Sequence, residues 1–203
     1  MTYSNFPFFN KKIIEIEAIH TNIIADLLSV TGQHNSKNIF QKNFINYLNI
    51  NNNYDYLCES EVQCSRVGKI RADIALWNKY FNIYIEIKVN SKAHHKQLFW
   101  YYIDSVMCNK KCSIVYLTPS GKPPEETACY ISKLQEPNQF KDIHKDINFY
   151  EDLEYIKTED DERYYIKKSM VKCLSFKNFC EIILCHHEDE EIQKYIDAIN
   201  LYF

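Results

Sequence analysis

The chain has 203 residues, a formal net charge of −3, and an ordinary composition with 46% hydrophobic and 25% charged residues. This length fits one sizeable domain and is short for two. Nonspecific coating of nucleic acid depends on an excess of Lys and Arg, so the negative charge argues against a protein that works in that way. It does not exclude an enzyme that meets phosphate through a metal ion at one cleft.

Residues 11–30 and 37–48 carry apolar side chains at helical spacing and predict the first two helices. Glu17 and His20 lie within the apolar stripe of the first helix. A carboxylate on a buried helix face is costly unless something pairs with it. Glu17 therefore either reaches solvent at the edge of the stripe or pairs with a metal ion or a lysine of the sheet.

A strand is predicted at 56–63, and a turn leads from it into two further strands at 71–77 and 83–89. The strand 83–89 alternates with a period of two. One face is aliphatic and must lie on a core, whereas Glu86 and Lys88 share the opposite face and point the same way.

Asp73, in the preceding strand, shares a face with Ala75 and Trp77, while Ala72, Ile74 and Leu76 face the other way. If the two strands pair as a hairpin, Asp73 can approach Glu86. A Glu–Lys pair on an exposed strand face is common and contributes little energy, so its neighbours decide between a structural and a functional interpretation.

Asn90 and Ser91 can cap a third helix over about 92–107, with His94, Gln97, Tyr101 and Asp104 along one side. This helix would begin close to the carboxyl end of the Glu86–Lys88 strand. An apolar strand at 112–117 follows and ends in the turn 118–121.

The second half of the chain is less regular. A short helix is predicted within 123–139, and the acidic stretch 142–162 is predicted to be peripheral helix and loop. One or two strands over 163–174 precede helices at 175–185, capped by Ser175, and 188–202. The order predicts one α/β domain over 1–203, in which a central mixed sheet is flanked by helices. Its parts are a core at about 11–126, a peripheral acidic segment at about 135–163 and extra C-terminal helices at about 175–203.

The 8 cysteines include no Cys-x-x-Cys pair, and most lie beside apolar residues, which predicts reduced cysteines in the core. The cluster of Cys180, Cys185 and the two histidines after it fits no usual zinc spacing. The stretch from Met1 to Phe9 lacks the pattern of a signal peptide, and no segment has the apolar length of a membrane span. We therefore expect a cytoplasmic protein without a membrane partner.

These motifs resemble the PD-(D/E)XK nuclease superfamily, in particular its compact, partly defence-associated bacterial branch. The nuclease motif corresponds to Asp73 and to Glu86-Ile87-Lys88, and 68–74 is similar to that branch's Gly-Arg-Ile-Asp-Ile segment. Its other motifs have counterparts in Glu17, His20, 25–28 and His34, in Gln97, Tyr101 and Tyr102, and in 115–121. Ala72 replaces the namesake proline, and Ile87 stands where asparagine is frequent.

The resemblance implies a restriction-endonuclease-like core and metal-dependent hydrolysis of phosphodiester bonds. Asp73, Glu86 and the backbone carbonyl of Ile87 would bind Mg²⁺ or Mn²⁺, with Glu17 completing the metal or water shell. Lys88 would position or deprotonate the attacking water, or stabilise developing negative charge. Gln97 would orient the substrate phosphate or Lys88.

The substrate implied by the resemblance is nucleic acid, with DNA favoured over RNA. Expected contacts to it are Arg71, Lys92, Lys96 and Tyr101. No sequence-reading module is present, which predicts low intrinsic specificity, or specificity supplied by a homodimer or a partner protein. The alternative is a noncatalytic or partner-activated protein that keeps the fold and binds nucleic acid or another protein. Antiviral defence is suggested by analogy alone.

Overall fold

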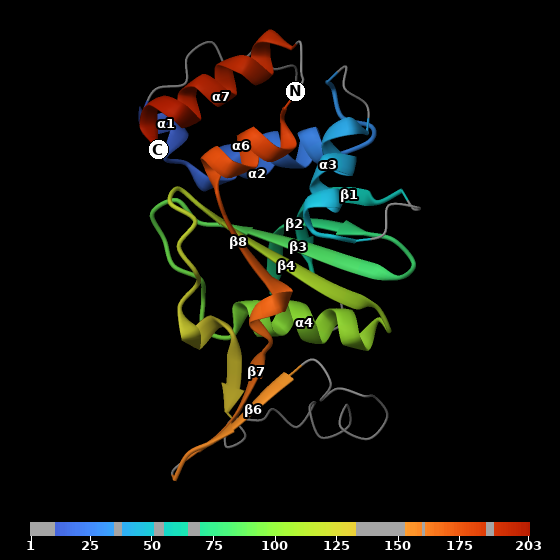
Figure 1. Ribbon diagram of the computed structural model, residues 1–203, viewed down its shortest axis with the longest axis vertical. Coiled ribbons are helices and arrows are strands. Elements are labelled where there is room, and N and C mark those ends of the chain that lie inside the picture. Colours follow the sequence, from blue (N-terminus) through green and yellow to red (C-terminus); the bar gives the residue numbers. More distant parts are fainter. Residues whose placement is uncertain are drawn as a thin grey trace.

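The computed structural model describes residues 11–34, 38–50, 55–64, 70–132, 153–159, 161–185 and 189–203. A mixed five-stranded sheet in the order β1-β2-β3-β4-β8 forms its centre (Figure 1). The strands β1 to β3 pair antiparallel, whereas β3, β4 and β8 pair parallel. The strands are β1 (Leu57–Gln63), β2 (Arg71–Trp77), β3 (Phe81–Ile87), β4 (Lys111–Thr118) and β8 (Val171–Ser175). The predicted α/β class, with a mixed central sheet flanked by helices, is confirmed.

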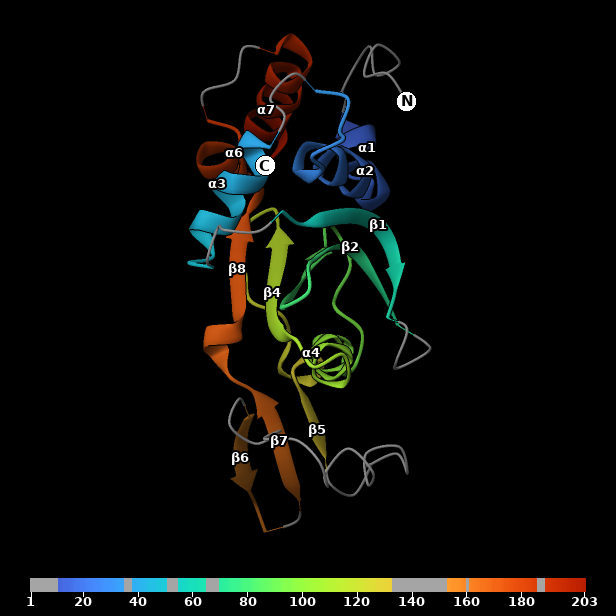
Figure 2. The same ribbon diagram turned by 90° about the vertical axis from the view of Figure 1, so that its right-hand side faces the viewer.

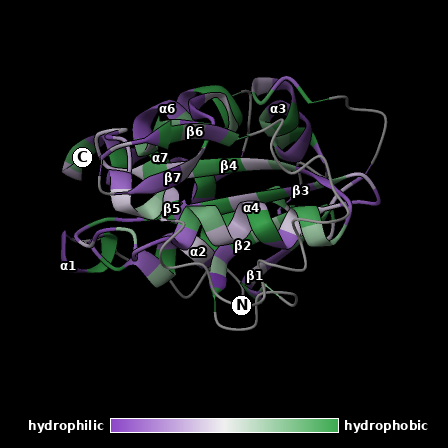
Figure 3. Cartoon of the chain, turned by 90° about the horizontal axis from the view of Figure 1, so that it is seen from below, coloured by the Kyte–Doolittle hydropathy of each residue, from purple (hydrophilic) through white to green (hydrophobic). Residues whose placement is uncertain are grey.

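Helices cover both faces of this sheet and create two cores (Figures 1 and 2). The first core is apolar and lies under α2, α3, α6 and α7, while α4 covers the opposite face over the second core. Figure 3 shows hydrophobic stretches along β4 and α4, which meet in this second core. The helices are α1 (Lys11–Ile14), α2 (Glu17–Leu28), α3 (Ile39–Tyr47), α4 (Gln97–Met107), α6 (Phe176–Ile183) and α7 (Glu190–Tyr202).

A smaller antiparallel sheet in the order β5-β7-β6 extends from the second core. Its strands are β5 (Tyr130–Ser132), β6 (Leu153–Lys157) and β7 (Glu162–Ile166). Ile131, Leu153 and Ile166 are buried in the second core with the side chains of α4. Two short 3-10 helices, Glu126–Ala128 and Lys168–Met170, connect this sheet to its surroundings.

The predicted first helix is broken, because α1 ends at Ile14 and α2 begins at Glu17. Ile16 has an extended backbone (φ −91°, ψ 110°). The buried His20 Nε2 donates to the Ile14 carbonyl at 2.7 Å, so a side chain rather than the next helical turn satisfies that carbonyl. The break makes Glu17 the first residue of α2.

The predicted third helix also begins later than expected. Helix α4 starts at Gln97, and Lys96 before it has a left-handed backbone with φ 62°. The Lys96 N–H donates to the Thr127 carbonyl at 2.8 Å. Ser91 does not cap this helix, since its hydroxyl donates to Glu17. Residues 92–96 are therefore an irregular segment that reaches the 3-10 helix near Thr127.

The acidic stretch differs most from its prediction. Its described part contains β6 and the start of β7, which pair with each other, rather than helix and loop. The described part of 123–139 contains the 3-10 helix Glu126–Ala128 and β5, and residues 133–152 lie outside the described residues. Strand β8 completes the central sheet, so the core extends beyond residue 126. The Ser175 cap is confirmed, because its Oγ accepts from the Asn178 N–H at 3.0 Å.

The facing of β2 is correct in part. Ile74 and Leu76 lie in the first core as predicted, but Ala72 packs in the second core with Ala75. Regular pairing is interrupted here, since Glu61 on β1, between the pairs Ser60–Ile74 and Val62–Ala72, has φ 56°. The positive φ of Glu61 therefore lies beside the place where the facing of β2 departs from strict alternation.

The cysteines are all unpaired, as expected, although only Cys64 and Cys180 are fully buried and Cys173 is exposed. The two histidines after Cys185 lie outside the described residues. Across the described ranges, none of the helices combines the length and the apolar character that crossing a membrane requires.

Candidate active site

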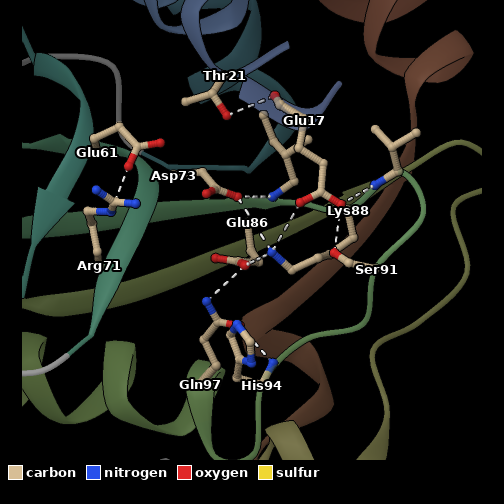
Figure 4. A network of polar contacts seen from close by, with 12 residues as sticks. Glu17, Thr21, Glu61, Arg71, Asp73, Glu86, Lys88, Ser91, His94 and Gln97 are labelled. Atoms are coloured by element: carbon tan, nitrogen blue, oxygen red, sulfur yellow. Dashed lines mark hydrogen bonds and ion pairs between the residues drawn. The ribbon is translucent and has the colours of Figure 1, made fainter. Parts of the chain in front are cut away.

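Asp73, Glu86 and Lys88 meet at one end of β2 and β3 (Figure 4). The antiparallel register pairs Ile74 with Ile85, so the next position places Asp73 opposite Glu86. The ladder stops there, and Asp73 Oδ2 instead accepts a hydrogen bond from the Ile87 N–H at 2.7 Å. Asp73 thus lies next to Glu86, as expected for two strands that pair as a hairpin.

Lys88 is the centre of the cluster. Its Nζ forms a close ion pair with Glu86 Oε1 and lies 3.8 Å from Glu17 Oε2 and 4.0 Å from Asp73 Oδ2. The Lys88 side chain is only 8% exposed. One buried ammonium group is therefore shared by carboxylates from α2, β2 and β3.

Glu86 is completely buried, and both of its carboxylate oxygens are hydrogen-bonded. Gln97 Nε2 donates to Oε1 at 2.8 Å, and the Tyr101 hydroxyl donates to Oε2 at 2.5 Å. Gln97 Oε1 accepts from the His94 N–H at 2.9 Å, which fixes the orientation of the amide. The first two turns of α4 therefore hold the Glu86 carboxylate.

Glu17 reaches the same cluster from the start of α2. Its Oε1 accepts from the Val89 N–H at 2.9 Å and from the Ser91 hydroxyl at 2.6 Å. Its side chain is 32% exposed, against 23% for Asp73. Of the two partners that the sequence suggested for a buried Glu17, the lysine of the sheet is the one within ion-pair distance.

Burial and neighbouring charges shift the ionisation of the cluster. Desolvation, together with the charge of Asp73, raises the pKa of Glu86 to about 7, although Lys88 opposes the shift. Burial also raises the pKa of Asp73, against the Ile87 N–H and Lys88.

The other two groups shift toward their charged forms. Burial would raise the pKa of Glu17, but hydrogen bonds from Ser91 and Val89 and the charge of Lys88 lower it overall. The carboxylates outweigh the desolvation of Lys88 and raise its pKa, with Glu86 contributing most. Lys88 is therefore an ammonium group at neutral pH.

Two residues with positive φ flank the cluster. Asn49 and Asn109 also have positive φ, but asparagine tolerates this conformation, whereas Glu61 and Lys96 are residue types that rarely adopt it. Glu61 lies opposite Asp73 in the β1–β2 register, and Lys96 directly precedes Gln97. Backbone strain of this kind concentrates at functional sites.

The expected nucleic-acid contacts lie in different environments. Arg71 is 66% exposed and pairs with Glu61 at 2.6 Å, and Lys92 is 77% exposed and pairs with Glu125. Lys96 is half-buried, and that burial lowers its pKa. Tyr101 is fully buried and holds Glu86, so it has no surface with which to contact nucleic acid.

Two polar residues of the site were not among the site residues predicted from the sequence. Ser91 donates to Glu17 from the loop after β3. Tyr116 on β4 is the register partner of Glu86, is 4% exposed, and interacts with the backbone of Ala93 and the charge of Lys88. Ser91 follows Lys88 closely in the chain, and this could have indicated that it lies near the site. The register that brings Tyr116 to Glu86 cannot be read from the sequence.

The carboxylates of the cluster are possible ligands for a metal ion. Within the described residues, no three His, Cys, Asp or Glu side chains form a group that could hold one. Mg²⁺ is usually bound by one or two carboxylates, several waters and substrate phosphate, so such a group is not required. Asp73 and Glu86 supply hard oxygen donors from adjacent strands, and Lys88 is the group that lies between them. The chemistry of the donors fits Mg²⁺ or Mn²⁺, provided that Lys88 moves.

Comparison with known proteins identifies no relative of this chain: no family model matches it, and no curated protein or solved structure is significantly similar. The chemistry of the site therefore follows from its own residues and their geometry.

Proposed function

We propose that this protein is a metal-dependent nuclease of the PD-(D/E)XK type, with a restriction-endonuclease-like fold and DNA as the favoured substrate. The observation that carries the proposal is the buried ion cluster in which Lys88 meets Glu17, Asp73 and Glu86. Burying charge costs free energy that apolar residues of similar size would not require. Strongly perturbed carboxylates and lysines of this kind are concentrated in catalytic sites.

Asp73 and Glu86 would hold Mg²⁺ or Mn²⁺, with the Ile87 carbonyl and water as further ligands. When bound there, the ion supplies Lewis-acid stabilisation of the charge that develops on the phosphate. Gln97 and Tyr101 hold the Glu86 carboxylate in one orientation, which lowers the cost of arranging it during the reaction.

Lys88 acts as a cation and hydrogen-bond donor in this proposal. Its raised pKa keeps it protonated at neutral pH, so it is poorly suited to deprotonate water. Its ammonium group can instead position the attacking water or stabilise negative charge on the phosphate oxygens. The strained backbone at Glu61 and Lys96 supports a functional site at this end of the sheet.

A noncatalytic or partner-activated protein of the same fold is the second candidate. The observation that favours it is that Lys88 already occupies the Glu86 carboxylate, while the described residues contain no metal-binding group of three. The two candidates differ in whether a divalent cation can enter the cluster.

Cleavage of plasmid, linear and single-stranded DNA, and of RNA, tests the proposal in EDTA, Mg²⁺ and Mn²⁺. The wild type is compared with Lys88→Ala and with Lys194→Ala, a matched loss of an exposed lysine on α7. We expect metal-dependent cleavage that falls about 10³-fold in Lys88→Ala, as for the loss of a charge-stabilising group, and is unchanged in Lys194→Ala. Cleavage that persists in Lys88→Ala would contradict the assigned site, and absence of cleavage with every metal would favour the noncatalytic candidate.

A further inference from the structure

Glu17 differs from the other carboxylates of the cluster in how it is held. Its Oε1 accepts from the Val89 N–H and the Ser91 hydroxyl, whereas its Oε2 faces Lys88 at 3.8 Å. Figure 4 shows the carboxylates of Glu17, Asp73 and Glu86 converging on the Lys88 ammonium group from different directions. Glu17 is thus fixed by the loop after β3 and directed at Lys88 rather than at Asp73 and Glu86.

The charges of the cluster do not balance. With all groups ionised, carboxylates from Glu17, Asp73 and Glu86 face a single ammonium group, which leaves an excess of negative charge. A divalent cation between Asp73 and Glu86 would offset that excess, but it would repel an ammonium group in contact with Glu86. The ion and the Lys88 Nζ therefore compete for the same oxygens.

We propose that Lys88 is the resident counter-cation of Asp73 and Glu86, that a divalent cation displaces its ammonium group from Glu86, and that Glu17 receives it. This inference rests on the proposed function. It makes Glu17 a positioning residue for Lys88 rather than a metal ligand, which was its expected role.

The direction of this movement has a use in the reaction. Glu17 is the most exposed of the three carboxylates, at 32% against 23% for Asp73 and 0% for Glu86. An ammonium group that leaves Glu86 for Glu17 moves toward solvent, from which substrate must arrive. Binding of the ion and presentation of Lys88 to the substrate phosphate become one event.

Calorimetric titration with Mg²⁺ and Mn²⁺ at pH 8 separates these roles. The set is wild type, Lys88→Met, Glu17→Gln and the double variant, with Glu61→Gln as a control for loss of a nearby carboxylate that does not pair with Lys88. We expect Lys88→Met to bind the ion about tenfold or more tightly, because a competing cation is removed. Glu17→Gln weakens binding in the wild-type background, beyond the effect of Glu61→Gln.

The double variant decides the role of Glu17. If Glu17 acts through Lys88, removing it from Lys88→Met changes the Kd less than about threefold, because the coupling is already lost. If Glu17 were a metal ligand, its removal would weaken binding of the ion by about tenfold or more in both backgrounds. The second result would overturn the positioning role.

The other outcomes are distinguishable. An ion that binds wild type and Lys88→Met equally overturns the competition while leaving the nuclease proposal in place. An ion that binds none of the proteins overturns both. If Lys88→Met does not fold, acetylation of wild-type Lys88 by an amine-reactive reagent gives the answer by mass spectrometry. Mg²⁺ should increase the acetylation of Lys88 about threefold or more, since the amine moves toward solvent and becomes more accessible to the reagent, and should leave Lys194 unchanged. No increase would overturn the displacement.

Discussion

The two faces of β3 are both buried, but they bury different chemistry. Ile83, Ile85 and Ile87 are 0% exposed and lie in the first core. On the opposite face, Tyr84 and Glu86 are 3% and 0% exposed beneath α4. An aliphatic side chain needs only close packing, whereas a buried polar atom must also find a partner.

The face under α4 meets that requirement through a line of hydrogen bonds. Asn82 donates to the Tyr84 hydroxyl at 3.1 Å, and Tyr84 donates to Asp104 at 2.7 Å. The Tyr84 ring stacks on Tyr101, whose hydroxyl reaches Glu86. Apolar packing therefore holds one face of this strand in place, whereas hydrogen bonds satisfy the other face and orient the Glu86 carboxylate at its end.

The largest effect is expected when neighbouring residues on the two faces of β3 are substituted in turn. We expect Ile85→Ala to lower the free energy of unfolding by about 2–5 kcal/mol, because it leaves a cavity in the first core. At neutral pH, Glu86→Gln should lower it by less than Ile85→Ala does, because Lys88 keeps Asp73 and Glu17 as partners and no cavity forms. Of the two variants, only Glu86→Gln should lose cleavage. Cleavage is measured on protein that urea denaturation shows to be folded. Equal loss of stability in both variants would contradict this division between the faces.

The next test uses pH, because His20 on one side of the sheet and Glu86 on the other are buried titratable groups of opposite charge type. In the first core, His20 Nε2 donates to Ile14 and Nδ1 accepts from the Tyr195 hydroxyl at 2.8 Å. Desolvation lowers the pKa of His20 to about 4 from 6.5. The unfolded chain therefore takes up this proton first, and stability should fall as pH decreases from about 6.5 to 4, by about 3 kcal/mol.

His20→Gln should flatten this part of the stability profile in urea titrations between pH 4 and 7. Glu86 works in the other direction, because its pKa is raised from 4.5 to about 7, so its contribution is present at low pH and is lost as pH rises through this range. Relative to wild type, Glu86→Gln should gain stability from pH 4.5 to 7. A profile that responds to neither variant would show that neither group titrates as buried.

The smallest effect is expected outside both cores. Lys92 pairs with Glu125 at the surface and is 77% exposed. Lys92→Ala should leave the midpoint of urea unfolding unchanged, as is usual for the loss of an exposed ion pair. Its value as a phosphate contact is measured separately, by binding to labelled DNA at two salt concentrations. A loss of affinity that shrinks at higher salt would support the contact, whereas unchanged affinity at both would remove Lys92 from the binding surface.

Local pattern predicts the parts of the site that one hairpin determines. The alternation of β3 gives the facing of Glu86 and Lys88, and hairpin pairing brings Asp73 to Glu86. These relations depend on a period of two and on neighbouring strands, both of which are readable along the chain.

The features that the sequence pattern does not predict depend on tertiary contacts. The break before Glu17 depends on His20 reaching Ile14, and the late start of α4 accompanies the contact of Lys96 with Thr127. Strand β6 forms by pairing with β7, although its acidic composition suggests a solvated segment. The position of Tyr116 depends on the parallel register of β3 and β4. Each of these facts joins residues whose proximity no local pattern expresses.

The bond from Val89 to Glu17 joins residues 72 positions apart in the chain. A polypeptide still emerging from the ribosome carries Glu17 long before Lys88 exists, and Gln97 and Tyr101 follow later still. The proposed cleaving activity can therefore appear only when the sheet and α4 have assembled. On the proposed function, a newly made or heat-opened copy would be unable to cleave the nucleic acid around it, because the cluster exists only in the folded protein.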